Sequence, residues 1–153
     1  MVSPFPLPAP MRRALDLARA AAEAGEVPIG AVVTRGGRIV AEGQNRNRRD
    51  NDPTAHAEMV AIRAAAAAIG DFRLGGHVLW VTLEPCAMCA GAISHARLDA
   101  VYYGAPDPKG GGVDHGARVF AHPQCHHRPE VFSGIGEGEA GELLRAFFAG
   151  RRS

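Results

Sequence analysis

Four residues of this chain have the types and the spacing of a hydrolytic zinc site. His56 and Glu58 belong to a His-Ala-Glu segment at 56–58, and Cys86 and Cys89 belong to a Pro-Cys-Ala-Met-Cys segment at 85–89. One imidazole and two thiolates give zinc three protein ligands, which leaves one tetrahedral position for a reactive water. Glu58 is the natural carrier for the protons of that water. The pattern therefore predicts zinc-assisted hydrolysis.

The reaction that uses all four residues is deamination. Bound zinc lowers the pKa of water from about 15.7 to roughly 7, so hydroxide is available at neutral pH. We expect this hydroxide to attack an electron-poor C=N carbon that carries an amino group. Glu58 would take the proton and return it first to the ring nitrogen and then to the leaving group, so that ammonia departs.

Other uses of the same residues have to be weighed. Many helices carry a His-x-Glu pair with no catalytic task, and a Cys-x-x-Cys pair also occurs in redox proteins, although there without the upstream His-x-Glu. A closed structural zinc site is the main alternative, with Cys125, His126 or His127 as the fourth ligand. Because a closed site leaves Glu58 without a task, the open catalytic site is favoured.

The spacing of His56 and Glu58 also predicts where the site lies. Two residues apart on a regular helix, they would point about 200° away from each other. They converge only if the pocket caps the end of the helix, and the turn-forming segment 52–54 supplies such a helix start. Pro85 likewise places both cysteines in the first turn of their helix, where N–H groups and the helix dipole favour thiolates.

The elements that must position these residues alternate between helix and strand. An apolar stripe at helical spacing, Met11, Leu15, Ala18 and Ala22, predicts a first helix over about 10–24. Further helices are predicted over 54–69, 86–96 and 139–148, and strands over 28–34, 38–42, 77–83, 100–104 and 130–132. The segment 35–38 predicts a hairpin turn, 44–53 a polar loop, and the glycine-rich 105–117 a mobile loop. The sum is a three-layer α/β domain with helices on both faces of a sheet.

The composition is that of an ordinary globular protein, with 46% apolar and 22% charged residues among 153. We expect one domain over 1–153, with 1–9 as a short extended tail. No apolar run resembles a signal peptide or a membrane span, so the cytoplasm is the expected location. Three cysteines cannot close a disulfide framework, and a net charge of +1 does not indicate a nucleic-acid partner.

Beyond the zinc motif, nearly the whole chain resembles the bacterial tRNA-specific adenosine deaminases. The zinc-ligand motif is shared by all cytidine-deaminase-like enzymes. The segment Asp-Pro-Thr-Ala-His-Ala-Glu at 52–58, together with the double phenylalanine at 147–148, is more specific to the tRNA enzymes. The resemblance extends through 26–32 and 81–92. Two departures are His126, where the family typically has asparagine, and the glycines 110–112.

The resemblance implies hydrolytic conversion of the wobble adenosine of a tRNA anticodon, chiefly in arginine tRNA, to inosine. It implies the cytidine-deaminase-like fold with a central mixed five-stranded sheet, and a homodimer. One zinc per subunit would be held by His56, Cys86 and Cys89, and Glu58 would shuttle protons. The alternatives are a deaminase of free guanine or cytosine on the same scaffold, and a non-catalytic zinc-stabilised RNA-binding module.

The resemblance also assigns substrate contacts. Asn45 would hydrogen-bond the flipped base, Ile29 would pack on its face, and the Ala57 N–H would contact its edge. Asp107 would contact the neighbouring nucleotides. Each has a structural alternative: Ile29 as plain core, Asn45 as a turn former and Asp107 as a solvated loop acid. The basic and aromatic residues nearby are either contacts to phosphates and bases or ordinary surface and core: Arg46, Arg48, Arg49, Phe147, Phe148, Arg151 and Arg152.

Overall fold

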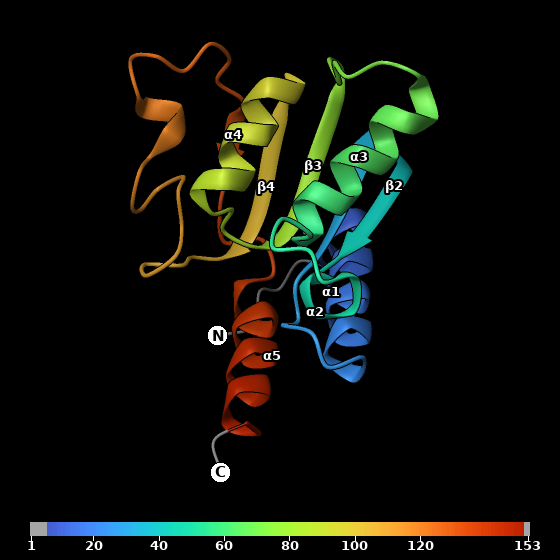
Figure 1. Ribbon diagram of the computed structural model, residues 1–153, viewed down its shortest axis with the longest axis vertical. Helices are drawn as coiled ribbons and strands as arrows, with labels where there is room; N and C mark the ends of the chain where they lie inside the picture. The colour runs from blue at the N-terminus through green and yellow to red at the C-terminus, as the bar shows by residue number, and fades with distance from the viewer. Residues whose placement is uncertain (1–5, 152–153) are drawn as a thin grey trace.

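One mixed five-stranded sheet organises residues 6–151, the part of the chain that the computed structural model describes (Figure 1). The strand order is β2-β1-β3-β4-β5. Strand β1 runs antiparallel to both β2 and β3, while β3, β4 and β5 are parallel. The predicted mixed sheet is confirmed, with bounds β1 Gly30–Arg35, β2 Arg38–Gln44, β3 His77–Leu83, β4 Ala100–Ala105 and β5 Glu130–Phe132.

Helices cover both faces of this sheet. The bounds are α1 Ala9–Glu23, α2 Asn47–Asp50, α3 Ala57–Ile69, α4 Ala87–Ala96, η1 Val119–Ala121 and α5 Glu137–Ala149. Apolar side chains of α3 and α4 form one core with the sheet, and those of α1 and α5 form a second. Figure 1 shows α3 and α4 on the near side of the strands and α1 behind them. The predicted three-layer α/β/α architecture is confirmed.

The second core continues into an aromatic stack across three neighbouring strands. Trp80 of β3 stacks on Tyr102 of β4 with ring centroids 4.0 Å apart, and Tyr102 stacks on Phe132 of β5 at 4.5 Å. Trp80 also donates a hydrogen bond from Nε1 to the Thr34 hydroxyl of β1. The stack therefore links four of the five strands on the face that α1 and α5 cover.

Several predicted boundaries shift by a few residues. The helix expected from 54 begins only at Ala57, because the Asp52 carboxylate accepts hydrogen bonds from the Thr54 N–H and hydroxyl and holds that segment in a turn. The helix expected from 86 begins at Ala87, with Cys86 as its N-cap. The first helix begins at Ala9, inside the expected tail 1–9, and residues 1–5 of that tail lie outside the described part. The short elements α2 and η1 were not predicted.

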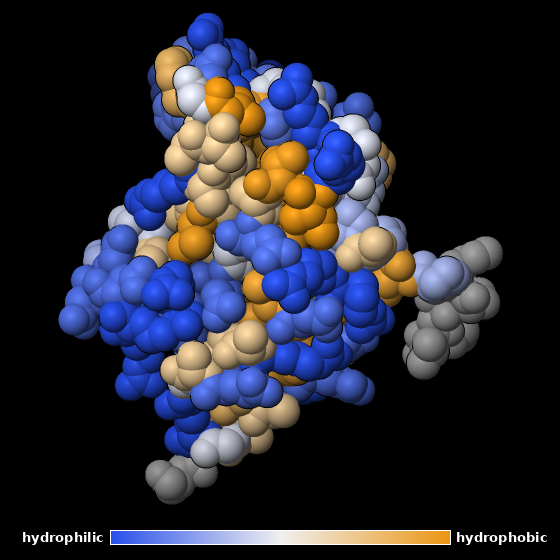
Figure 2. Space-filling view, turned by 90° about the vertical axis from the view of Figure 1, so that its right-hand side faces the viewer, coloured by the Kyte–Doolittle hydropathy of each residue, from blue (hydrophilic) through white to orange (hydrophobic). Residues whose placement is uncertain are grey.

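The hairpin between β1 and β2 confirms the predicted turn. Arg35 pairs with Arg38, and Gly36 and Gly37 both have positive φ, as a two-residue type I′ turn requires. Strand β2 forms an edge of the sheet, and its residues Ile39 and Val40 are exposed. Figure 2 shows this side of the molecule, with hydrophobic patches between hydrophilic residues. Within residues 6–151, no helix is long and apolar enough to cross a membrane.

Candidate active site

Four segments meet at one end of the sheet because of its strand directions. The parallel strands β3 and β4 finish there, so residues 84–86 and Asp107 follow at the same end. Strand β1 runs the opposite way and begins there, just after Ile29. Gly30 of β1 pairs with Gln44 of β2, which brings Asn45 to the same place. All the sequence-predicted site residues therefore lie on this end or on the helices that start beside it.

A glycine on β2 allows the start of α3 to rest directly on the sheet. A Cβ at Gly43 would lie 2.4 Å from the Ala57 carbonyl oxygen, closer than any real contact. The Ala57 N–H donates a 2.9 Å hydrogen bond to Asn45 Oδ1. His56 stands just before the helix in an extended conformation with ψ of 156°, and Glu58 lies in the first turn. This non-helical His56 removes the spacing conflict, because the imidazole precedes the helix while Glu58 lies in its first turn.

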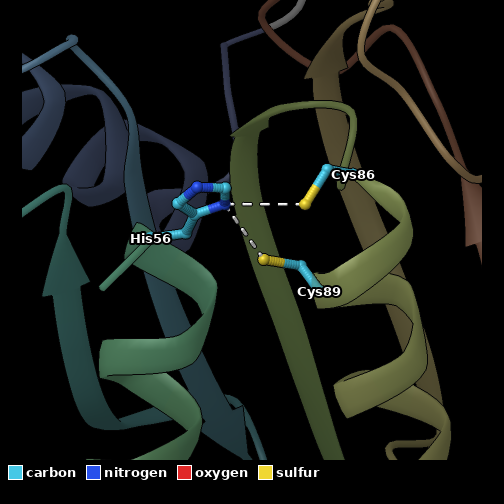
Figure 3. A group of neighbouring side chains, drawn as sticks. All are labelled: His56, Cys86 and Cys89. Carbon is cyan, nitrogen blue, oxygen red and sulfur yellow. Dashed lines mark hydrogen bonds between the residues drawn. The ribbon is translucent and has the colours of Figure 1, made fainter. Parts of the chain in front are cut away.

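The proposed ligand atoms converge from the starts of α3 and α4 (Figure 3). His56 Nδ1 lies 3.5 Å from Cys86 Sγ and 3.5 Å from Cys89 Sγ, and all three ligand atoms lie within 4.8 Å of one another. A tetrahedral zinc with nitrogen at about 2.0 Å and sulfur at about 2.3 Å places such atoms about 3.6 Å apart. The donor set and its dimensions therefore fit zinc.

The ligand set remains open on one side. Among residues 6–151, no further His, Cys, Asp or Glu ligand atom joins these three. Cys125 Sγ instead lies 3.5 Å from the hydroxyl of Ser94, which is near the end of α4. The same hydroxyl donates a hydrogen bond to the carbonyl of His127. His126 belongs to this same exposed segment. The alternative of a closed structural site completed by Cys125, His126 or His127 is therefore wrong.

The charges of the site suit metal binding and proton transfer. Hydrogen bonds from Cys89 and with His56 outweigh burial and lower the pKa of Cys86 to about 4, so the thiolate is available as a ligand. The hydrogen bond with Cys86 raises the pKa of His56. Glu58 is only 4% exposed, and its burial raises the pKa of its carboxyl to about 7. A carboxyl with this pKa gains and loses a proton readily near neutral pH.

Known proteins share this arrangement. The cytidine and deoxycytidylate deaminase zinc-binding region matches residues 8–105, which include both ligand motifs. A tRNA-specific adenosine deaminase from Agrobacterium fabrum is 56% identical over 142 residues, covering 93% of each chain. This chain belongs to the tRNA-specific adenosine deaminase family. It is a zinc deaminase with the cytidine-deaminase-like fold that the resemblance implied.

Two solved structures show which kind of deaminase this chain resembles more. One comes from work on A-to-I editing by tRNA:A34 deaminases at the wobble position of transfer RNA. It superposes with a TM-score of 0.87 at 56% identity, covering 88% of this chain and 98% of the other. A guanine deaminase from Bacillus subtilis gives a TM-score of 0.62 at 47% identity, covering 63% of this chain and 62% of the other. The similarity to the tRNA enzyme thus extends farther along both chains.

The predicted substrate residues lie at the same end of the sheet as the ligand motifs. Asn45 is buried, and because it accepts the Ala57 N–H, that N–H reaches a base edge only if Asn45 releases it. Ile29 is half-buried and packs against the core of α3 and α4, so part of its side chain is core, as the alternative interpretation held. Asp107 is half-buried, and its Oδ1 accepts the N–H groups of Lys109 and Gly110.

Glu84 lies directly before the Pro-Cys-x-x-Cys motif, and the sequence reasoning did not single it out. Its buried carboxylate accepts hydrogen bonds from the N–H of Asp107 at 2.9 Å, and from those of Val113, Asp114 and His115 at 3.2, 2.9 and 3.1 Å. It also contacts His115 Nδ1 at 2.7 Å. Burial alone would raise the pKa of Glu84, but these hydrogen bonds outweigh it and hold the pKa below its usual range. A signal was present, since Glu84 directly precedes the Pro-Cys-x-x-Cys motif.

The glycines of the same loop serve close packing. A Cβ at Gly111 would lie 2.5 Å from the Glu84 carboxyl carbon, and one at Gly112 would lie 2.5 Å from the Ala87 nitrogen. Tyr103 of β4 also donates a short hydrogen bond to Asp114 in this loop. The segment is a loop, as expected, but its contacts contradict the mobility that its glycine content predicted.

A second buried glutamate, Glu26, holds the segment that follows Asn45. It accepts the N–H groups of Arg48 and Arg49 at 3.2 and 2.8 Å, and Arg49 Nε at 3.3 Å. Arg46 pairs with Asp50 across α2. The Arg46 and Arg49 side chains therefore have intramolecular ion-pair partners, whereas the exposed Arg48 side chain has none among residues 6–151. Phe148 is exposed and Phe147 half-buried beneath Arg151, and Arg152 lies outside the described residues.

Proposed function

We propose that this enzyme hydrolyses the wobble adenosine of a tRNA anticodon, chiefly in arginine tRNA, to inosine and ammonia. The observation that carries the proposal is an open three-ligand zinc site with the buried carboxyl of Glu58 at its side, in a chain of the tRNA deaminase family. An anticodon loop presents bases that are already unpaired, which lowers the free energy of flipping one into the pocket.

The chemistry divides between the metal and the chain. His56, Cys86 and Cys89 would hold the zinc, which when bound would supply the Lewis acidity that makes a water acidic at neutral pH. Glu58 accepts a proton from this water and donates it to the ring nitrogen next to the reacting carbon. The same carboxyl would then take the remaining proton from the added hydroxyl group and give it to the amino group, which leaves as ammonia. A pKa of about 7 suits both directions of transfer.

The base would be held by the residues around the ligand set. Asn45 supplies a side-chain amide next to the start of α3, and Ile29 supplies an apolar surface for the face of the ring. The Ala57 N–H would donate to the base edge when Asn45 turns toward the base. Asp107, on the loop that follows β4, would contact the neighbouring nucleotides.

The proposal extends to partners and location. A homodimer is supported by the family resemblance, and light scattering at working concentration measures it; a monomer would contradict it. The substrate, a tRNA, supports a cytoplasmic location. The arginine tRNA preference is measured by comparing anticodon stem-loops of different tRNAs.

The decisive experiment is inosine formation on an anticodon stem-loop with adenosine at the wobble position. The control is the same stem-loop with the adenosine moved one position, and free guanine and cytosine are assayed in parallel by ammonia release. Inosine in the wobble stem-loop alone is the expected result. Activity only on a free base would replace the proposal with a free-base deaminase. No activity on any substrate with zinc loaded would favour a non-catalytic RNA-binding module.

A further inference from the structure

Two loops border the zinc site, and each is tied to a buried carboxylate. The first, residues 45–52, follows β2 and contains only the single turn α2. The second, residues 106–115, follows β4 and has no helix or strand. Together they carry Asn45 and Asp107, two of the proposed substrate contacts. Each loop makes some hydrogen bonds of its own, such as Asn47 to the Asp52 carbonyl and the Gly110 N–H to Asp107, but each is also bound to a glutamate outside it.

The carboxylate of Glu84 fixes the second loop at both of its ends. One oxygen accepts the Asp107 N–H and lies against the His115 ring, and the other accepts the N–H groups of residues 113–115. Gly111 packs against the same carboxyl group, where any side chain would clash. Glu84 is only two residues before the zinc ligand Cys86, so the residue that binds this loop and the ligand belong to the same short segment, 84–86.

Glu26 does the same for the first loop. It is 1% exposed and accepts two successive backbone N–H groups, those of Arg48 and Arg49. The Arg49 guanidinium, which Glu26 also contacts, donates to the Asn45 carbonyl oxygen at 3.0 Å. The Arg46 N–H then bonds to the Ala55 carbonyl, directly before the His56 ligand. A chain of hydrogen bonds thus runs from Glu26 through the loop to the zinc site.

We propose that Glu26 and Glu84 are positioning residues that hold these two loops ready for the RNA, a role that rests on the proposed function. Hydrogen bonds to a charged acceptor are stronger than neutral ones, and both acceptors are shielded from water. When a loop is already ordered in the free enzyme, the loss of its conformational entropy no longer reduces the free energy of binding. Loss of either carboxylate therefore weakens substrate binding more than it slows the chemical step.

The test compares zinc-loaded Glu26→Gln and Glu84→Gln enzymes with the unaltered one. Hydrogen exchange should quicken at the amides of residues 48–49 only in the first variant, and at 107 and 113–115 only in the second, so each variant is the control for the other. KM for the wobble stem-loop should rise about tenfold, because a factor of ten corresponds to the free energy of about one such hydrogen bond. The value of kcat should stay within about threefold. Glu42→Gln is the matched surface control, because Glu42 accepts its hydrogen bonds from Arg13 of α1.

Each outcome decides something. Unchanged exchange in both variants, or faster exchange with an unchanged KM, overturns the positioning role, as does a loss of activity that follows zinc content alone. If Glu84→Gln does not fold, His115→Ala removes a single contact of the same carboxylate and should give a smaller rise in KM; Arg49→Ala serves Glu26 in the same way. Absence of inosine formation by the unaltered enzyme refutes the proposed function instead, while the exchange data still decide whether the carboxylates hold the loops.

Discussion

Replacing Gly112 by alanine should weaken zinc binding, although Gly112 is not a ligand. Its added Cβ would lie 2.5 Å from the Ala87 nitrogen and 2.8 Å from the Cys86 carbonyl carbon, and both neighbours are backbone atoms that cannot rotate away. Ordinary contact begins at 3.4 Å, so the loop and the start of α4 have to separate by about 0.9 Å. Zinc–ligand distances tolerate only about 0.2 Å. The displacement therefore reaches the Cys86 thiolate.

Overpacking of this kind typically costs about 1–3 kcal/mol, which corresponds to a loss of zinc affinity of about fivefold to 150-fold. The assay is competition for zinc against a chromophoric chelator, with circular dichroism as the check on folding. Gly91→Ala is the matched control, because Gly91 lies on the same helix α4 and its added Cβ would meet open space. Zinc affinity equal to that of the unaltered protein in Gly112→Ala would refute the packing argument.

Three further predictions concern the site and its surroundings. Glu58→Ala should retain zinc but lose about 10²- to 10⁴-fold in turnover, the usual worth of a general acid–base; retained turnover would remove its role as proton carrier. Cys86→Ala should lose the metal, and an unchanged zinc content by atomic absorption would contradict its assignment as a ligand. The third prediction concerns Glu26: burial alone would raise its pKa, but hydrogen bonds from Arg49 and Arg48 hold the folded-state pKa below the ordinary 4.5. Its stabilisation is thus present above that value and lost as pH falls through the folded pKa, so below about pH 5 the unaltered protein should lose thermal stability faster than Glu26→Gln; parallel melting curves would count against this.

The fold was predictable from the sequence because its signals are local. The strand 77–83 is a mostly apolar run, and the helix near 10–24 has a clear apolar stripe; both were predicted within a residue or two. The start of α3 was placed three residues early, because the turn that delays it depends on the Asp52 side chain rather than on helix propensity. The turn α2 was missed because a polar, asparagine-rich segment has no apolar periodicity to reveal it.

Some residues of the candidate site were predictable from the sequence and others were not. The ligands His56, Cys86 and Cys89 were predicted because each motif is short and its chemistry follows from spacing. The roles of Glu26 and Glu84 were not, because their partners lie 22 to 31 residues away in the sequence. The glycines at 110–112 were misinterpreted for a related reason. Glycine content predicts flexibility, whereas close packing against a distant carboxylate is visible only in three dimensions.

The aromatic stack on the face of the sheet covered by α1 and α5 gives this enzyme an intrinsic fluorescence probe of its folded state. Trp80 is its only tryptophan, and it is held by Tyr102 on one strand and Thr34 on another. The indole belongs to the core of α1 and α5, whereas the zinc ligands lie at the starts of α3 and α4 in the opposite layer. Its emission therefore follows the melting of the sheet itself. A substitution in either substrate loop that lowers activity and leaves this emission unchanged has therefore spared the scaffold.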